Sequence, residues 1–445
     1  MKFNRSILNP KITALVIGIL SVVLYFLWGY ELARFEHKKL ILIYSLLFGG
    51  YYFVLKHSNI EDNWLNAFAV LFRLIFLFSL PTLSQDFYRF IWDGRLILEG
   101  LNPYLYTPNE LIVSSPELFS EMNTLHNGMG RLSAKYFSNY PPIHQIPFIL
   151  ASLIFKKNIF GSVVVIRIIL IIADLGILIY TKKLLKKLKL PIRSVYWFIL
   201  NPLVIIELTG NLHFEGLMLC FFIMALYFIH SKKWHIASIT MALSVAVKLI
   251  PVLSLPLVVN KLGWKKSIVF YITTGCVIVI LFLPFLSLDF LENYSATIGL
   301  WFSNFEFNAS IYYLLKWALT KVEGLKFINS MGAVVAFVLT IQASYQLLHK
   351  KKKTEDLLYM IFWIICSYYF LSTTVHPWYI TSLLMLSIFT KFKFVILWSY
   401  TLIFSYFAYG EFDVKESSLW LSVEYIPVVL MLLWELYFRK KLKHH

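Results

Sequence analysis

Charged residues are scarce in this sequence, and their scarcity excludes most classes of soluble protein. Asp, Glu, Lys and Arg make up 15% of the 445 residues, whereas hydrophobic residues make up 59%. A soluble domain is about a quarter charged and about half apolar. The composition therefore excludes a soluble enzyme and a disordered chain. It also excludes nucleic acid as a partner despite a net charge of +17, because the basic residues form short clusters between apolar runs and no basic soluble face.

Cysteines and cofactor motifs are equally scarce. There are three cysteines, each inside an apolar run: Cys220, Cys276 and Cys366. They exclude a disulfide scaffold, and no pair has the spacing of metal ligands. No phosphate-binding P-loop and no dinucleotide glycine motif occurs. We therefore expect no cofactor and no resident metal, although a few carboxylates could bind a divalent ion.

Long apolar runs are what the sequence has in abundance, and they predict an all-α, polytopic membrane protein. The first run, 12–30, is long enough to cross a bilayer and has no small-residue cleavage site, so we interpret it as an uncleaved span. The runs together predict a bundle of about 13 transmembrane helices. Runs shorter than a full span are expected to be half-helices buried among their neighbours.

The positive charges predict the orientation of the bundle. Most Lys and Arg residues cluster in short loops and at both termini, which places those segments in the cytoplasm. Residues 85–140 then form a large extracytoplasmic loop, and short outward turns fall at 210–216 and 374–377. Most unusual polar residues lie in these outward segments. We therefore expect a multi-pass protein of the bacterial inner membrane with its site on the extracytoplasmic face.

The segment Ser84-Gln-Asp-Phe-Tyr-Arg-Phe-Ile-Trp-Asp-Gly-Arg95 carries the strongest chemical signal. If it is helical, Asp86, Arg89 and Asp93 share one face, and Arg89 can pair with both carboxylates. A neighbouring cation keeps a carboxylate ionised, as a general base requires. The alternative is a solvated cluster of ion pairs that caps a helix end. Two turns follow, Gly100-Leu-Asn-Pro-Tyr104 and Tyr140-Pro-Pro-Ile-His-Gln145, which can also be ordinary loop punctuation.

Ionisable residues inside apolar runs are the next signal, because a charge at membrane depth is costly and often functional. Lys248 lies in the middle of the run 235–259, where Lys248-Leu-Ile-Pro251 predicts a broken hairpin. Its ammonium group could bind a phosphate, or it could be an ion-paired structural lysine. We expect Arg73, Arg167 and Asp174 to form structural ion pairs between helices.

Two outward turns carry histidines. In Gly210-Asn-Leu-His-Phe-Glu-Gly216, His213 and Glu215 can form hydrogen bonds with sugar hydroxyls. In Thr373-Thr-Val-His-Pro-Trp-Tyr379, His376 can donate a hydrogen bond to a phosphate oxygen. A structural role remains the alternative for each histidine.

Taken in order, these segments resemble the GT-C superfamily of polyprenyl-phosphate-sugar-dependent glycosyltransferases. They are most similar to the bacterial integral-membrane mannosyltransferases, and more distantly to the first mannosyltransferase of the GPI-anchor pathway. The further matching segments are Asn201-Pro202, Gly210-Asn-Leu-His213, Lys248-Leu-Ile-Pro251, Phe307-Asn-Ala-Ser310 and His376-Pro-Trp-Tyr379. The likeness covers about 64–390, which would be the catalytic core. Residues 1–63 would be a two-span extension, and 391–445 would be C-terminal spans with a basic tail.

The resemblance implies an inverting transfer of a hexose from a polyprenyl-phosphate sugar to an extracytoplasmic glycolipid or lipid-linked glycan. Mannose is the favoured sugar, and glucose or a pentose stays open. The implied catalytic base is Asp86, with Asp93 as the alternate. The candidate ligands of the donor phosphate are Arg89, Lys248, His376 and Tyr379. The candidate ligands of the sugar or the acceptor are Arg95, Tyr140, Gln145, His213, Glu215 and Asn308. The superfamily often has Asp where this sequence has Glu215.

A transporter or flippase of lipid-linked sugars is the rival hypothesis, since it too would need intramembrane cations and aromatic residues. It predicts functional charges on both faces of the membrane, whereas the polar residues here gather on one face. A purely structural membrane scaffold would leave the long polar loop 85–140 unexplained.

Overall fold

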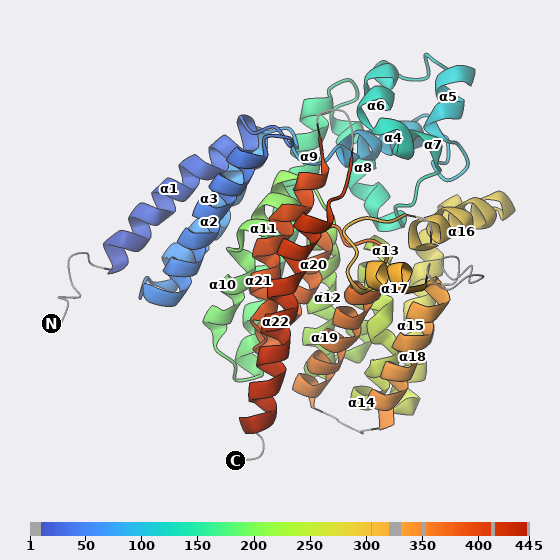
Figure 1. Ribbon diagram of the computed structural model, residues 1–445. Coiled ribbons are helices and arrows are strands. Elements are labelled where there is room, and N and C mark those ends of the chain that lie inside the picture. Colours follow the sequence, from blue (N-terminus) through green and yellow to red (C-terminus); the bar gives the residue numbers. More distant parts are fainter. Residues whose placement is uncertain (1–9, 304, 320–330, 349–352, 411–413, 443–445) are drawn as a thin grey trace.

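The computed structural model describes residues 10–303, 305–319, 331–348, 353–410 and 414–442, and within these ranges the protein is a bundle of helices (Figure 1). The β structure in the described ranges consists of two isolated bridges, Phe307 to Thr374 and Tyr409 to Val414. The expected all-α class is therefore confirmed.

Three helices at the N-terminus pack together at one side of the bundle (Figure 1). They are α1 (Pro10–Tyr30), α2 (His37–His57) and α3 (Asp62–Ile75), followed by the short η1 (Phe76–Phe78). The buried residues of α1 recur every three or four positions, from Ala14 and Gly18 to Tyr25. Its other face exposes large apolar side chains such as Ile19 and Val23. A helix with one packed face and one exposed apolar face is typical of a membrane span at the edge of a bundle.

The long loop 85–140 folds into a group of short helices at one end of the molecule (Figure 1). These are α4 (Asp86–Leu98), α5 (Pro108–Ser114), α6 (Met122–Gly128) and α7 (Gly130–Lys135), and they lead into α8 (Pro142–Ile154). We call α4 to α7 the helical cap. In Figure 1 the cap lies at the opposite end from α14 and from the C-terminal end of α22.

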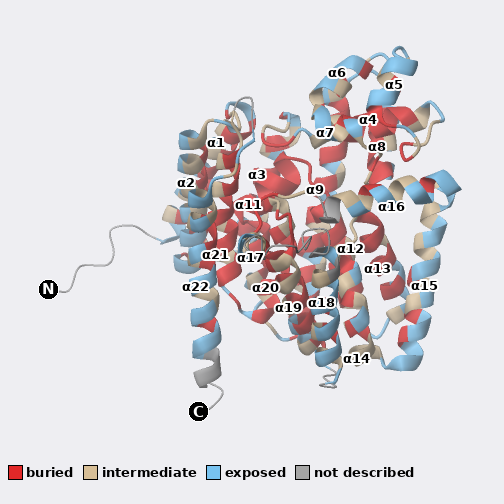
Figure 2. Cartoon of the chain, turned by 45° about the vertical axis from the view of Figure 1, so that its right-hand side comes forward, coloured by how far each residue is buried: buried red, intermediate tan, exposed pale blue. Residues whose placement is uncertain are grey.

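The centre of the bundle holds most of the buried residues (Figure 2). The elements that follow α8 are α9 (Ile159–Lys187), η2 (Ile192–Val195), α10 (Tyr196–Ile199), α11 (Pro202–Val204), the π-helical turn η3 (Ile205–Gly210), α12 (Glu215–His230), α13 (Trp234–Val247), η4 (Ile250–Leu257) and α14 (Val258–Leu262). The remaining elements are α15 (Trp264–Phe282), η5 (Leu283–Phe285), α16 (Leu288–Ser303), α17 (Ile311–Leu319), α18 (Met331–Leu348), α19 (Thr354–Leu371), η7 (Pro377–Tyr379), α20 (Ile380–Thr390), α21 (Phe394–Thr401), η8 (Leu402–Ala408) and α22 (Ser418–Leu442).

The charges inside the bundle are satisfied by neighbouring helices. Arg73 on α3 donates to the carboxylate of Asp174 on α9 at 2.6 Å, which is the expected helix-to-helix ion pair. Arg167 differs from the expectation, because backbone carbonyls hold it. It donates to the carbonyls of Leu77, Ser79, Thr209 and Gly210. The π-helical turn leaves carbonyl groups without a hydrogen-bond donor from the helix, and the guanidinium group of Arg167 donates hydrogen bonds to them.

The expected count of about 13 full spans is not confirmed. Six described helices are long and apolar enough to cross a membrane, namely α1, α2, α9, α15 with η5, α19 and α22. A seventh results if the pair 192–199 and 202–210, bent by 55°, is one broken span. The other apolar runs form shorter helices of 10–17 residues. Apolar run length in a sequence does not show where a helix breaks, so several predicted spans are pieces of helix.

Gly94 sets how closely α4 approaches α8. A Cβ atom at this position would lie 2.3 Å from the carbonyl oxygen of Phe148 and 2.6 Å from the hydroxyl of Ser152. The backbones of the two helices therefore touch at Gly94, and this contact fixes the cap to the membrane bundle. Gly49, in contrast, lies on an exposed stretch of α2 with open space around it.

We expect the substitution Gly94→Ala to lower the free energy of unfolding by about 1–3 kcal/mol, because the added methyl group overpacks the α4–α8 contact. Gly49→Ala is the matched control and should leave stability unchanged or raise it by about 0.5–1 kcal/mol, since alanine favours a helix. The measurement is thermal unfolding of both variants in detergent. Equal unfolding temperatures for the two would contradict this account of Gly94.

Candidate active site

Asp86 is the first residue of α4, where the cap meets the bundle. Its backbone N–H donates to the hydroxyl of Ser84 at 3.3 Å, and its side chain is half-buried. Burial raises its pKa from 3.8 to about 6, against the attraction of Lys248. The charge of Glu215 raises the pKa further, and that of Arg34 lowers it. Residues from three distant parts of the chain therefore act on this carboxylate.

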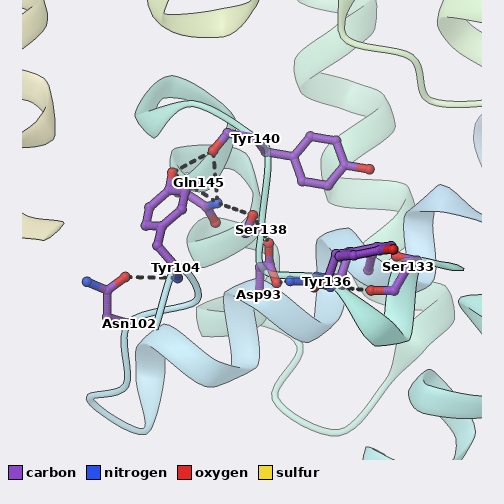
Figure 3. Close-up of polar contacts among 9 residues, drawn as sticks. Asp93, Asn102, Tyr104, Ser133, Tyr136, Ser138, Tyr140 and Gln145 are labelled. Atoms are coloured by element: carbon purple, nitrogen blue, oxygen red, sulfur yellow. Dashed lines mark hydrogen bonds and ion pairs between the residues drawn. The ribbon is translucent and has the colours of Figure 1, made fainter. Parts of the chain in front are cut away.

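Arg89 and Asp93 form an ion pair in a separate, buried network, of which Figure 3 shows Asp93 with its neighbours. Arg89 donates to Asp93 at 2.7 Å and to the carbonyls of Ser133 and Tyr136 at 2.6 and 2.9 Å. The hydroxyl of Ser138 donates to the other oxygen of Asp93 at 2.5 Å. Among the described residues Arg89 thus pairs with Asp93 and not with Asp86, which differs from the expected pairing with both. On this helix the carboxylate of Asp93 is therefore fully hydrogen-bonded, whereas that of Asp86 is not.

Gln145 and Tyr140 extend this network. Gln145 donates to the hydroxyl of Ser138 at 3.3 Å and to the carbonyl of Tyr140 at 3.4 Å, while that carbonyl also accepts from the hydroxyl of Tyr104 (Figure 3). The Tyr140 ring points away from Gln145 in this view. Burial raises the pKa of Tyr140, and the charge of Asp86 raises it further, so this phenol belongs to the surroundings of Asp86.

Two other candidate ligands are occupied elsewhere. Arg95 donates to the carboxylate of Glu121 at 2.9 and 3.0 Å and ties α4 to the rest of the cap. Asn308 donates to the carbonyl of Val375 at 3.2 Å and to Glu424 at 3.1 Å. The structure therefore gives both residues buried structural contacts.

Lys248 stands at a break in the chain. α13 ends at Val247, Lys248 has an extended backbone, and η4 begins at Ile250, so the predicted break is present. The ammonium group forms an ion pair with the carboxylate of Glu215, the first residue of α12, and lies 5.5 Å from the centroid of the Tyr379 ring. The side chain of Glu215 is 3% exposed and that of Lys248 is 23% exposed. One carboxylate oxygen of Glu215 has no hydrogen-bond partner in the described structure.

The two candidate histidines lie on opposite faces of one indole ring. The His213 ring stacks on Trp378 at a centroid distance of 3.6 Å, and the His376 ring stacks on its other face at 4.4 Å. Burial lowers the pKa of His376 to about 3, and the positive charge of Lys248 lowers it further. Burial and Lys248 likewise hold the pKa of His213 well below its usual value. Both histidines are neutral at physiological pH, so they offer hydrogen bonds and not charge.

Glu207 and Arg34 are two neighbours of the site that the sequence analysis did not assign. Glu207 accepts hydrogen bonds from the hydroxyl of Tyr406 and from Asn211, and Asn211 in turn accepts from the backbone of Leu83, three residues before Asp86. Arg34 donates to the carbonyl of Leu83 at 3.2 Å. An acidic residue in an apolar run was a usable signal for Glu207. Arg34 gave none, because it lies in a short turn between the first two spans.

The structure thus brings together one set of the predicted residues and separates another. Asp86, Tyr140, Glu215, Lys248, His213, His376 and Tyr379 form the candidate site. Asp93, Arg89, Gln145, Arg95 and Asn308 lie in buried structural networks. Among the described residues no group of three or more His, Cys, Asp or Glu side chains is arranged to hold a metal ion. The arrangement combines a half-buried carboxylate with a lysine and neutral hydrogen-bond donors, which suits proton removal beside an anionic leaving group.

The fold and the site together define a class: a polytopic membrane protein with a half-buried carboxylate, a lysine and neutral hydrogen-bond donors in one site. Comparison with known proteins identifies the family within this class. Residues 5–263 match the family described as "Alpha-(1->6)-mannopyranosyltransferase, N-terminal domain". Because the match covers more than half of the sequence, the chain belongs to this family. The match includes Arg34, Asp86, Glu215 and Lys248, and it spans the expected boundary at residue 63.

One curated relative is the protein named alpha-(1->6)-mannopyranosyltransferase A, from Mycobacterium tuberculosis. It is 27% identical over 156 residues, which cover 35% of this chain and 28% of the relative. The chain therefore matches only about a quarter of that relative's length. No solved structure matches the chain.

Lys248 and Glu215 should be coupled in stability. We expect Lys248→Met to destabilise the protein by about 3 kcal/mol, because it leaves the buried Glu215 carboxylate without its counter-charge. The double variant Lys248→Met/Glu215→Leu should recover most of this loss, since it removes both charges. Denaturation in detergent of the single and double variants measures the coupling. Additive effects of the two substitutions would show that the pair is not coupled.

Proposed function

We propose that this protein transfers a hexose, most simply mannose, from a polyprenyl-phosphate sugar to a hydroxyl group of an extracytoplasmic glycolipid or lipid-linked glycan. Membership of the mannosyltransferase family supports the sugar and suggests an α-(1→6) linkage. Six apolar helices long enough to cross a membrane support a lipid-linked donor. The position of the cap, opposite α14 and the C-terminal end of α22, fits a reaction on the outer face (Figure 1).

The observation that carries the proposal is that Asp86, unlike Asp93, has a carboxylate free for chemistry. Both oxygens of Asp93 accept hydrogen bonds, from Arg89 and from Ser138. Within the described residues, no ion pair and no side-chain hydrogen bond engages the Asp86 carboxylate. It is half-buried and lies under the influence of Lys248. We therefore assign the general base to Asp86 and a structural role to Asp93.

The proposed step is a single inverting displacement. The Asp86 carboxylate takes the proton of the acceptor hydroxyl as the hydroxyl oxygen bonds to the anomeric carbon. The bond from that carbon to the phosphate oxygen breaks, and its electron pair leaves with the polyprenyl phosphate. Negative charge grows on the phosphate, so a cation near it lowers the barrier. The Lys248 ammonium group, although paired with Glu215, and the neutral donors His376 and Tyr379 are the candidates for its surroundings.

The substitution Asp86→Asn should lower the rate of sugar transfer by about 10²- to 10⁴-fold, because an amide cannot accept the proton. Asp289→Asn, on an exposed turn of α16, is the matched control and should leave the rate unchanged. The measurement is formation of glycosidic product by purified protein from polyprenyl-phosphate mannose and a glycolipid acceptor. Near-normal turnover by the Asp86 variant would eliminate Asp86 as the base.

The same assay separates the enzyme from the rival lipid-sugar flippase. In proteoliposomes a flippase would move the labelled donor across the bilayer without making a glycosidic bond. New product with the donor left in its own leaflet supports the transferase. The anomeric configuration of that product, compared with that of the donor, tests inversion.

The pH dependence of transfer follows from the raised pKa of Asp86. As the pH falls through about 6, the carboxylate becomes protonated and can no longer act as a base. We therefore expect kcat/KM to fall about tenfold per pH unit below this value. The histidines cannot cause this fall in kcat/KM at acidic pH, because the pKa of His376 is about 3 and that of His213 is also depressed. A steady-state pH profile from 4.5 to 8 measures the fall, and a flat profile would contradict the assignment.

A further inference from the structure

The turn between α1 and α2 reaches the segment that leads into Asp86. Arg34, in this turn, donates from Nη1 to the carbonyl of Leu83 at 3.2 Å. Its guanidinium group lies over the ring of Tyr409, 4.1 Å from the centroid. His37, at the start of α2, contacts the carbonyl of Tyr409 at 2.9 Å and stacks on Phe407 at 4.6 Å. The N-terminal helices are therefore docked onto the candidate site at their outward end.

Arg34 differs from Lys248, Arg89 and Arg95 in its charge balance. Lys248 is paired with Glu215, Arg89 with Asp93 and Arg95 with Glu121. No described carboxylate lies within ion-pair distance of Arg34. The described residues also provide no hydrogen-bond partner for its Nε and Nη2 groups. Arg34 is half-buried, so a positive charge that is in no ion pair keeps unused donors near the site, and the nearest charge known to act on it is that of Asp86.

The surroundings of Tyr409 locate Arg34 on the same side as Asp86. Burial raises the pKa of Tyr409 to about 12, Arg34 lowers it, and Asp86 and Glu207 raise it. The Tyr409 ring lies 5.6 Å from that of Phe307, which lies 5.0 Å from that of His376. These rings continue into the stack of His376, Trp378 and His213. We call this row of rings the aromatic wall. Arg34 stands at the Tyr409 end of the wall. Lys248 lies beside Tyr379, whose ring contacts those of His376 and Trp378 within the row.

We propose that Arg34 binds the phosphate group of the lipid-phosphate donor, so that the α1–α2 turn forms part of the active site. This inference rests on the proposed function. The planar guanidinium group presents paired donors that match phosphate oxygens, and the Tyr409 ring holds its plane in place. Lys248 is less suited to be the main ligand of the phosphate, because Glu215 already neutralises its charge. A cation that is not already held in an ion pair offers more stabilisation to a phosphate that gains negative charge during transfer.

The competing interpretation is that Arg34 only holds the Leu83 carbonyl and so positions Asp86. The two roles have different signatures. A positioning residue would lower kcat and shift the acid limb of the pH profile while leaving the affinity for lipid phosphate unchanged. A phosphate ligand would weaken that affinity in the absence of any acceptor or turnover.

The test is direct binding of a short-chain polyprenyl phosphate to the full-length protein in detergent, measured by calorimetry at pH 7.5. We expect Arg34→Gln to weaken binding by about 10- to 100-fold, the usual effect of losing hydrogen bonds from a charged group. Arg34→Lys should fall between this variant and the wild type, since it keeps the charge and loses the paired donors. Lys38→Gln, which removes an exposed charge four residues away, is the matched control and should bind normally.

Two further ligands identify the source of the phosphate. The uncharged polyprenol should bind weakly, and equally, to the wild type and to Arg34→Gln. Phosphatidylglycerol should not displace the polyprenyl phosphate; displacement at equal concentration would mean a general headgroup site and would overturn the donor assignment. Unchanged affinity of Arg34→Gln for polyprenyl phosphate would also overturn it, whatever its transfer rate.

Binding without turnover keeps this test separate from that of the proposed function. Asp86→Asn should bind polyprenyl phosphate about as well as the wild type, because the base does not hold the phosphate. If Asp86→Asn transfers sugar normally while Arg34→Gln loses binding, the proposed base is wrong and the phosphate site stands. If Asp86→Asn is inactive while Arg34→Gln binds normally, the base stands and the phosphate site is wrong.

Discussion

The ion pair between Lys248 and Glu215 is the interaction around which the candidate site is built. A charged lysine at the break between α13 and η4 would be costly without a partner, and the first residue of α12 supplies it. The pair joins two segments that are 33 residues apart in sequence. Its net charge is near zero, yet the ammonium group still acts on Asp86 and on both histidines. Burial is the main cause of the low pKa of both histidines, and the ammonium group adds to it, while it opposes the effect of burial on the pKa of Asp86.

In α4, most of the charged residues make structural contacts, and the first residue is the candidate base. After its first three residues the helix carries Arg89, Asp93 and Arg95, whose charged groups are paired with one another, with Glu121 or with backbone carbonyls. Gly94 lets the same part of the helix lie directly against α8. The helix is therefore rigidly held from its C-terminal side. Its first residue, Asp86, can then project from a fixed support with its carboxylate unengaged, as precise positioning of a catalytic group requires.

The two N-terminal helices are more than a membrane anchor. The turn that joins them contacts both Leu83, beside the base, and Tyr409, at the end of the aromatic wall. Because the family match begins at residue 5, these helices belong to the same matched region as Asp86 and Lys248. The α1–α2 turn is thus packed against segments near residue 83 and near residue 409, which lie far apart in the sequence.

The sequence alone determined the all-α membrane class and the break at Lys248, because these depend on local composition and proline. It also indicated that Arg73, Arg167 and Asp174 would need partners, since charges in apolar runs are costly, but not which groups those partners would be. Tertiary structure decided the rest. Only the packed bundle showed that Arg89 serves Asp93 and not Asp86, that Glu215 neutralises Lys248, and that Arg34 approaches the site. The physical reason is that spacing along one helix shows which side chains can meet, whereas partners from distant segments depend on how helices pack and where they break.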